Sequence, residues 1–413
     1  MPFVPPSDFP FDDQLPGMSV LLDADKMRLR VQEGFGIHGR LARLVIRGYD
    51  FVPEESLRVR YTAEVGTLRY DLTAQIGFPA PDPKLVERLT ASARDRRVAR
   101  LPVARLADVK AQISWYPIDL GLPVLALSDV ELADTVGIDS AGPTSQMSWT
   151  PGVRAVVRFP KALVRVYRDP DAAKASAAAI RMTSGHIPVA AVLSTNTDEG
   201  LVAQELRPGR PMLRDKARAD SAMVVQFIEK LHNLDPLEID PEQTLTTRSP
   251  HVVLDDAATT VAFVSYCRPD LAERLDVVLA GLRASAPTDL TNVPSHGDFG
   301  YEVLQRQGDD LHIVDIDTLC LSPRALDLAT FAVSLMLGKD DDADEVLAFG
   351  SALNELPSDA GAPSDFRGFN WFAAAEVLRT LDAPLRGLGR DWPERTASRV
   401  CTAELLTAAA AAA

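Results

Sequence analysis

The chain has 413 residues, of which 46% are apolar and 24% charged, and its formal net charge at neutral pH is −15. This composition is ordinary for a globular protein, and the length predicts two or three domains, each with a core of its own. The acidic balance argues against a nucleic-acid-binding protein, which would need a basic face, so we expect no nucleic-acid partner.

Cysteine usage and hydropathy narrow the class of protein further. Cys267, Cys320 and Cys401 are far apart and show no CxxC spacing, which is typical of a protein in the reducing cytoplasm and argues against a zinc site. No apolar run approaches the ~20 residues of a membrane helix, so no membrane association is expected. The first residues lack the basic start and apolar core of a signal peptide, and we therefore predict a cytoplasmic protein.

Residues 1–148 are predicted to form a small α/β domain. Three strand-like segments between residues 42 and 76, separated by turns at residues 53–56 and at Gly66, predict an antiparallel meander. Residues 1–20 are predicted to form a proline-rich arm, and residues 108–117 a further strand. Helices are predicted over residues 23–33, 84–95 and 130–136. This domain contains no cluster of candidate ligands.

Gly34, Gly36 and Gly39 spell the pattern G-x-G-x-x-G. A dinucleotide-binding fingerprint should follow a strand and open a helix, whereas this stretch follows a predicted helix and precedes a strand. We therefore favour a helix cap and turn, and a Rossmann-type oxidoreductase is a minor alternative.

Residues 149–206 are predicted to form a small antiparallel β lobe. The segments RAVVRF and ALVRVYRD flank Pro160-Lys161 as a hairpin, a helix spans residues 170–182, and PVAAVLSTNTDEGLVAQELRPG supplies two more strands.

Residues 207–413 are predicted to be mostly helical. An amphipathic helix spans residues 216–234, and His232 near its end is interpreted as a cap. Further helices are predicted within 252–284, over 325–337 and 344–356, and in two closing segments. Asp340–Asp342, Asp344 and Glu345 form an acidic run. It could be a patch near the acceptor site that favours an amine substrate, but we favour a solvated helix N-terminus.

The stretch Pro294–Phe331 concentrates the residues that could do chemistry. Four acids, Asp298, Asp315, Asp317 and Asp327, stand at the ends of apolar segments, where a carboxylate is costly unless it binds a metal, a proton or a hydrogen-bond donor. Phosphoryl transfer needs such residues, because one carboxylate orients and deprotonates the attacking hydroxyl and another holds the magnesium that bridges the nucleotide phosphates.

A hairpin around Gly308 would bring two of these acids together. Val303-Leu304 can pair with residues 311–314, so that Asp315 emerges at the end of the hairpin near the turn that contains Asp298. The sequence therefore predicts that Asp298 and Asp315 lie at one edge of this hairpin.

The motifs HGDFGYEVL and HIVDIDTLCLSPRALDLATF resemble the paired motifs of the aminoglycoside phosphotransferase and choline kinase-like superfamily. The likeness is greatest to the actinobacterial maltokinase-like branch, whose members have an extra N-terminal segment. The resemblance implies an α+β, bilobal, protein-kinase-like fold, with the N-terminal α/β domain 1–148 preceding a β lobe 149–206 and a helical lobe 207–413. It implies an ATP-dependent (or other NTP-dependent) kinase that uses Mg²⁺ and acts on a hydroxyl of a small acceptor.

By this resemblance Asp298 is the catalytic base and Asp315 the metal ligand. Asp327 would anchor the catalytic loop, and His296 would be a loop residue without an acid–base role. The family usually has Asn or Gln as a second metal ligand shortly after the base; here the loop is one residue shorter and Glu302 falls nearest that position. Asp317 is a further candidate metal ligand.

The resemblance also implies nucleotide contacts in the β lobe. Arg165 matches the family lysine that binds the α- and β-phosphates, with a surface strand residue as the alternative. The phosphate-covering loop would be residues 159–162, where Lys161 could add charge, although we favour an ordinary turn because the loop lacks glycine. The backbone of Gln204, Glu205 and Leu206 would bind adenine.

These departures leave a second hypothesis open. The Arg at the lysine position, the absence of a Glu in the following helix, the loop without glycine and Glu302 together favour a pseudokinase that binds or regulates without transferring phosphate. The two retained acids favour the kinase. The acceptor and the oligomeric state do not follow from the sequence.

Overall fold

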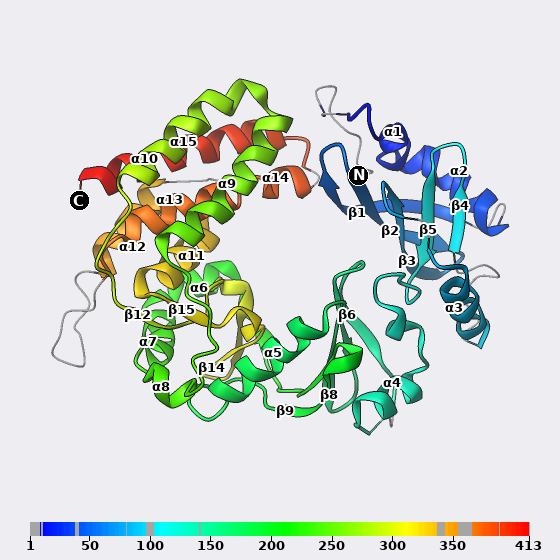
Figure 1. Ribbon diagram of the computed structural model, residues 1–413, viewed down its shortest axis with the longest axis horizontal. Coiled ribbons are helices and arrows are strands. Elements are labelled where there is room, and N and C mark those ends of the chain that lie inside the picture. The colour runs from blue at the N-terminus through cyan, green and yellow to red at the C-terminus, as the bar shows by residue number, and fades with distance from the viewer. Residues whose placement is uncertain are drawn as a thin grey trace. The chain divides into compact units, whose positions relative to one another are not determined.

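The computed structural model describes residues 9, 11–37, 41–79, 81–95, 103–139, 142–336, 343–353, 366–387 and 389–412. The chain divides into two units. The first comprises Met1–Lys174, Leu193–Leu206 and Pro384–Trp392, and the second comprises Ala175–Val192, Arg207–Ala383 and Pro393–Ala413. Antiparallel strand pairs and helices make up the described ranges, which confirms the predicted α+β class (Figure 1).

The first sheet of the first unit is the predicted meander with two strands added. Its order is β1-β2-β3-β5-β4, and every neighbouring pair is antiparallel. Leu57, Val59 and Tyr61 alternate along β2 and are buried, because successive side chains of a strand point to opposite faces. The strands are β1 (Leu41–Val52), β2 (Ser56–Val65), β3 (Leu68–Ile76), β4 (Val103–Leu106) and β5 (Ala111–Trp115).

Three helices, α1 (Met18–Leu21), α2 (Ala24–Phe35) and α3 (Pro83–Asp95), accompany this sheet. The Asp23 side chain caps α2 by accepting hydrogen bonds from the N–H groups of the next turn, and Gly36 ends it at φ +64°. The favoured reading of a helix cap is therefore confirmed, but the helix runs two residues past its predicted end at Glu33, and the cap is Gly36 instead of Gly34. Gly39 lies outside the described residues.

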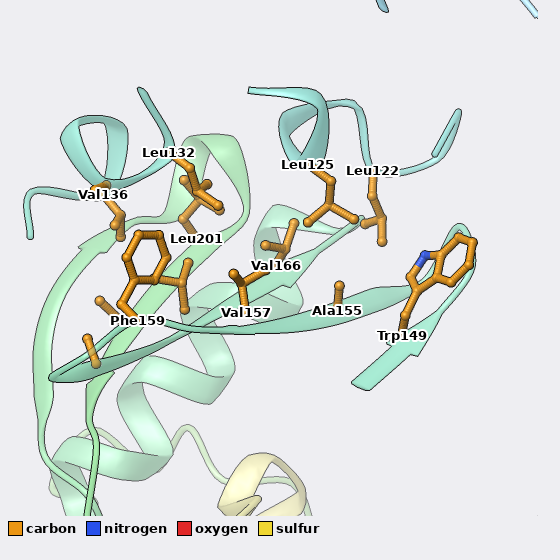
Figure 2. Close-up of a cluster of buried hydrophobic side chains, with 14 residues drawn as sticks. Leu122, Leu125, Leu132, Val136, Trp149, Ala155, Val157, Phe159, Val166 and Leu201 are labelled. Carbon is orange, nitrogen blue, oxygen red and sulfur yellow. The ribbon is translucent and has the colours of Figure 1, made fainter. Parts of the chain in front are cut away.

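The second sheet has the order β6-β7-β8-β10-β9. One of its faces is covered by the short helix η1 (Pro123–Ala126) and by α4 (Asp129–Val136), whose leucines pack against Val157, Phe159 and Val166 (Figure 2). A capping box of Ser128 and Glu131 starts α4. The strands are β6 (Ser145–Thr150), β7 (Arg154–Arg158), β8 (Ala162–Tyr167), β9 (Val192–Asn196) and β10 (Leu201–Glu205). The predicted hairpin at Pro160-Lys161 is confirmed, and α5 (Pro170–Thr183) follows it.

The second unit is mainly helical. Its longer helices are α7 (Ser221–His232), α9 (Pro250–Cys267), α10 (Ala272–Ala284), α11 (Arg324–Met336), α12 (Ala343–Leu353) and α13 (Phe369–Arg379), and its short ones are α6 (Arg214–Ala219) and α8 (Pro236–Ile239). The helix α13 packs against α9 and α11 and is buried along most of its length. Near the end of the chain, α14 (Ala383–Arg386) belongs to the first unit apart from Ala383, and α15 (Trp392–Ala412) belongs to the second unit apart from Trp392.

The prediction of one helix over residues 216–234 is wrong. The helix is interrupted at Asp220, which separates α6 from α7. The Asp220 carboxylate accepts a hydrogen bond from Lys216 and pairs with Arg306, so these side-chain contacts hold the break in place.

Two small sheets complete the second unit. The predicted hairpin around Gly308 is present as β13 (Leu304–Gln307) and β14 (Asp310–Ile313), with β11 (Arg210–Pro211) beside β13. The strands β12 (Asn292–Ser295) and β15 (Cys320–Pro323) pair antiparallel. In the part of the chain that the structure describes, no helix is both long and apolar enough to span a membrane.

Candidate active site

The His-Gly-Asp turn leaves the end of β12 and is held by the carboxylate of Asp327. Asp327 Oδ2 accepts a 2.8 Å hydrogen bond from the His296 N–H, and Oδ1 accepts another of 2.8 Å from the Gly297 N–H. Asp327 lies in the first turn of α11 and is fully buried. The expectation that Asp327 anchors this loop is confirmed.

Gly297 is required by the shape of the turn. Its φ is +81°, and a Cβ on this residue would lie 2.6 Å from the carbonyl oxygen of Thr318. A side chain here would therefore be strained by the backbone and would overlap the Thr318 carbonyl. The Gly297 carbonyl accepts a hydrogen bond from Arg248, so both polar groups of this peptide are fixed.

Behind the loop, Asp327 pairs with a histidine whose role the sequence analysis missed. His232 Nε2 lies 3.0 Å from Asp327 Oδ2, and His232 Nδ1 lies 3.1 Å from Glu229 Oε1. Burial alone would lower the pKa of His232, but its hydrogen bonds to the carboxylates of Asp327 and Glu229 raise it. The pKa of Asp327 is lowered, because these contacts outweigh the opposing effect of burial. His232 is therefore a buried link from α7 to the loop anchor and not a helix cap.

His296 stabilises the loop in its neutral form. The Asp298 N–H donates to His296 Nδ1 at 3.3 Å, and His296 Nε2 has no hydrogen-bond partner among the described residues. Burial lowers the pKa of His296, although the carboxylates of Asp327, Asp298, Asp315 and Asp317 oppose this. A neutral imidazole that accepts from a backbone N–H fits the predicted role of a loop residue.

Asp298 combines a fixed backbone with an accessible carboxylate. Its side chain is 48% exposed, and Oδ1 accepts a 2.6 Å hydrogen bond from Arg379 Nη2 at the end of α13. Arg379 also forms a two-point ion pair with the buried Glu376. The sequence analysis identified neither residue. Two charged residues three positions apart in an otherwise apolar helix were the available signal, because buried charges need partners.

Asp315 follows β14 at a left-handed φ of +67° and precedes the short helix η5 (Ile316–Thr318). This conformation is uncommon for a residue other than glycine, although Asp adopts it more readily than most. Asp317 Oδ1 accepts a 2.7 Å hydrogen bond from the buried Ser176 of α5. Contacts within the second unit thus hold Asp317 in place.

Glu302 lies in the short helix η4 (Tyr301–Val303), two residues beyond Gly300. Its Oε2 folds back against Gly300, where a Cβ would come within 2.5 Å of that oxygen. Burial raises the pKa of Glu302, and the charge of Asp298 adds to the effect. Among the described residues, no group of three or more His, Cys, Asp or Glu side chains comes together as a metal cage.

In the first unit, Arg165 is only 7% exposed, so the alternative of a surface strand residue is wrong. Its Nε donates to Gln204 Oε1 across the β8–β10 pair. Residues 159–162 form a tight turn closed by a hydrogen bond from the Phe159 N–H to the Ala162 carbonyl, with Lys161 exposed. The Leu206 N–H donates to the Lys161 carbonyl, so an adenine ring would have to use other backbone groups of residues 204–206. Glu205 is exposed at the end of β10.

Most of the acidic run beside α12, Asp340–Asp342, lies outside the described residues. Asp344 and Glu345 stand in the first turn of α12, and Glu345 pairs with Arg218. The favoured reading of acids at a helix N-terminus is confirmed for these two residues.

The described ranges thus combine antiparallel sheets and helices with an anchored His-Gly-Asp turn. A family model described as "Phosphotransferase enzyme family" matches residues 139–390, more than half of the chain. The chain belongs to this family.

Several solved structures are similar to the chain over about two thirds of its length. A choline/ethanolamine kinase family protein from Mesorhizobium loti is 18% identical, with a TM-score of 0.45 over 66% of this chain and 94% of that one. A choline kinase from Cryptosporidium parvum is 12% identical (TM-score 0.46; 65% and 89%), and a macrolide 2'-phosphotransferase from Brachybacterium faecium is 19% identical (TM-score 0.41; 65% and 96%). No curated protein matches the chain.

Proposed function

We propose that the protein is an ATP-dependent small-molecule kinase that transfers the γ-phosphate to a hydroxyl of a sugar, an aminoglycoside-like molecule or a similar acceptor. The observation that carries this proposal is the state of Asp298. Asp327 fixes the two peptides before it, while its own carboxylate stays about half exposed. A carboxylate with both properties can orient an acceptor hydroxyl without rearranging.

In the proposed reaction, the acceptor oxygen forms a bond to the γ-phosphorus while the bond from that phosphorus to the leaving ADP oxygen breaks. Asp298 accepts the hydroxyl proton and later returns it to solvent. The products are the phosphorylated acceptor and ADP. Positioning matters most in such a reaction, because little covalent chemistry falls to the protein.

Asp315 is the proposed Mg²⁺ ligand, with Glu302 and Asp317 as further oxygen ligands. In kinases Mg²⁺ takes one or two carboxylates together with phosphate oxygens and waters. The donor set suits that mode in its chemistry, because Asp315, Asp317 and Glu302 are all carboxylates. When bound, Mg²⁺ would neutralise negative charge on the nucleotide phosphates.

Arg165 and Lys161, with the backbone of Gln204, Glu205 and Leu206, remain the proposed nucleotide contacts. The burial of Arg165 against Gln204 supports a held guanidinium, which suits a bidentate contact with phosphate oxygens.

A pseudokinase is the second candidate, and two observations favour it. One oxygen of Asp298 is already occupied by Arg379, and the turn at residues 159–162 is closed by its own hydrogen bond. In this alternative the protein binds a nucleotide or another ligand and regulates a partner without transferring phosphate.

A thermal-shift and turnover experiment separates the candidates. The kinase proposal expects a melting shift with ATP that requires Mg²⁺, followed by acceptor-dependent ADP formation in a panel led by sugars, as the maltokinase-like resemblance suggests, and including amino sugars, choline and macrolides. A Mg²⁺-dependent shift without ADP formation for any acceptor would support the pseudokinase. No nucleotide shift at all would remove the kinase proposal.

A further inference from the structure

Arg379 is shared by two carboxylates of unequal exposure. Its Nη2 donates to Asp298 Oδ1 and to Glu376 Oε1, both at 2.6 Å, and its Nε donates to Glu376 Oε2 at 2.7 Å. The Glu376 side chain is 5% exposed, whereas that of Asp298 is 48% exposed. The guanidinium thus joins a buried anchor to the proposed base.

Glu376 fixes the plane of the guanidinium. The two residues are three positions apart on α13 and therefore lie on one face of the helix. A planar two-point contact allows the guanidinium little rotation, so Nη2 is presented to Asp298 in one direction. Burial would lower the pKa of Arg379, but the charges of Glu376 and Asp298 raise it, so the cation persists.

The end of α13 is itself fixed by neighbouring helices. Thr260 Oγ1 of α9 donates to the Arg379 carbonyl at 3.1 Å, and Arg399 Nη1 of α15 donates to the Thr380 carbonyl. Asp298 is thus anchored twice: α11 holds the backbone before it through Asp327, and α13 holds its side chain.

We propose that Arg379, held by Glu376, is a positioning residue for the Asp298 base. It occupies Oδ1 and leaves Oδ2 for the acceptor hydroxyl, since no described residue donates to that oxygen. This inference rests on the proposed kinase function. The contact would restrict the rotamers of a half-exposed base, which an unheld Asp at a surface would sample freely.

The test is a double-mutant cycle on Arg379 and Asp298 that measures the rate of ADP formation in the presence of Mg²⁺ and ATP. The rate is measured once with water as the phosphate acceptor and once with the best acceptor of the panel. Arg379→Met should lower kcat about 10–100-fold with little change in the KM for ATP, because orientation of the base is lost while nucleotide contacts stay. In an Asp298→Asn background, Arg379→Met should change kcat less than about twofold, because both residues act through one carboxylate. Arg379→Lys should restore part of the rate.

Two further variants guard against effects on folding. Arg379→Met leaves Glu376 buried without its partner, so Arg379→Met/Glu376→Leu removes the whole pair and should show the same loss of kcat with a near-normal melting temperature. Arg274→Met is the matched control, because Arg274 makes the same two-point pair with Glu404 at 2.8 and 2.7 Å. It should leave kcat unchanged.

The outcomes separate this inference from the function on which it rests. If Asp298→Asn abolishes turnover while Arg379→Met and the paired variant retain it, the positioning role is wrong and the kinase stands. Equal losses from Arg379→Met in both Asp298 backgrounds indicate a structural role and overturn the inference. If Asp298→Asn itself has no effect, or the wild type forms no ADP, the proposed function fails as well.

Discussion

Removing the Asp327 carboxylate should destabilise the loop that contains Asp298, because the hydrogen bonds that hold this loop are lost. In an Asp327→Ala variant, His232 Nε2 and the N–H groups of His296 and Gly297 lose their shared acceptor. Breaking a buried ion pair costs about 3–5 kcal/mol, and each orphaned buried N–H adds about 1–3 kcal/mol. Since members of one network are not additive, we expect a total loss of about 4–6 kcal/mol, a large part of a normal stability of about 5–15 kcal/mol.

Urea unfolding and hydrogen–deuterium exchange of the peptide spanning residues 292–300 provide the assay. The unfolding midpoint should fall, and the His296 and Gly297 amides should exchange faster than in the wild type even where the protein remains folded. Asp309→Ala is the matched control: the Asp309 side chain is fully exposed and pairs only with Arg306 in the described part of the chain, so it should change stability by less than about 0.5 kcal/mol. Unchanged exchange of both amides in Asp327→Ala would refute the anchoring argument.

Three further predictions follow from the same loop. Because the pKa of His232 is raised, its ion pairs contribute fully to stability below its ordinary pKa of 6.5 and are lost as the pH rises through the raised pKa. The free energy of unfolding should therefore fall above pH 6.5. His232→Gln should reduce this dependence on pH, as measured by urea titrations at several pH values. Gly297→Ala should cost about 2–4 kcal/mol of stability from strain and overlap, measured by urea unfolding, and a cost below 0.5 kcal/mol (the ordinary surface range) would contradict the geometry. Glu302→Ala should raise about tenfold the Mg²⁺ concentration needed for the ATP-induced melting shift, whereas Glu302→Asn, which keeps an oxygen ligand, should restore it; equal behaviour of Ala and Asn would remove Glu302 from the metal site.

Local features of the fold were predictable because their signals are local. Alternating apolar residues gave the meander of β1–β3, and Gly308 gave the β13–β14 hairpin. The break at Asp220 was not visible, since the apolar spacing continues across it and one of the two contacts that stabilise the break comes from Arg306, 86 positions away.

The candidate site divides in the same way. The role of Asp327 could be inferred because its spacing from the His-Gly-Asp turn belongs to a motif within one short stretch. Arg379 and Glu376 could not, since their contact with Asp298 spans 81 positions and depends on how α13 packs against α9 and α11. His232 likewise has its functional contact 95 positions away, so its place at a helix end suggested only a cap.

The burial of Arg165 shows a different limit. Its neighbours Val164 and Val166 occupy the face of the sheet that η1 and α4 cover, so Arg165 lies on the opposite face, and only the tertiary structure shows that this face is buried there as well. The family match covers residues 139–390 and so leaves the first sheet, β1–β5, without an assigned role.

The central claim is that Asp298 is the base of a phosphoryl transfer. The most direct measurement is the rate of ADP formation by wild type and by Asp298→Asn, each with ATP, Mg²⁺ and the acceptor that the panel identifies. The account predicts a loss of about 10²–10⁴-fold in kcat with the Mg²⁺-dependent ATP melting shift retained. An Asp298→Asn protein that forms ADP at the wild-type rate would contradict it.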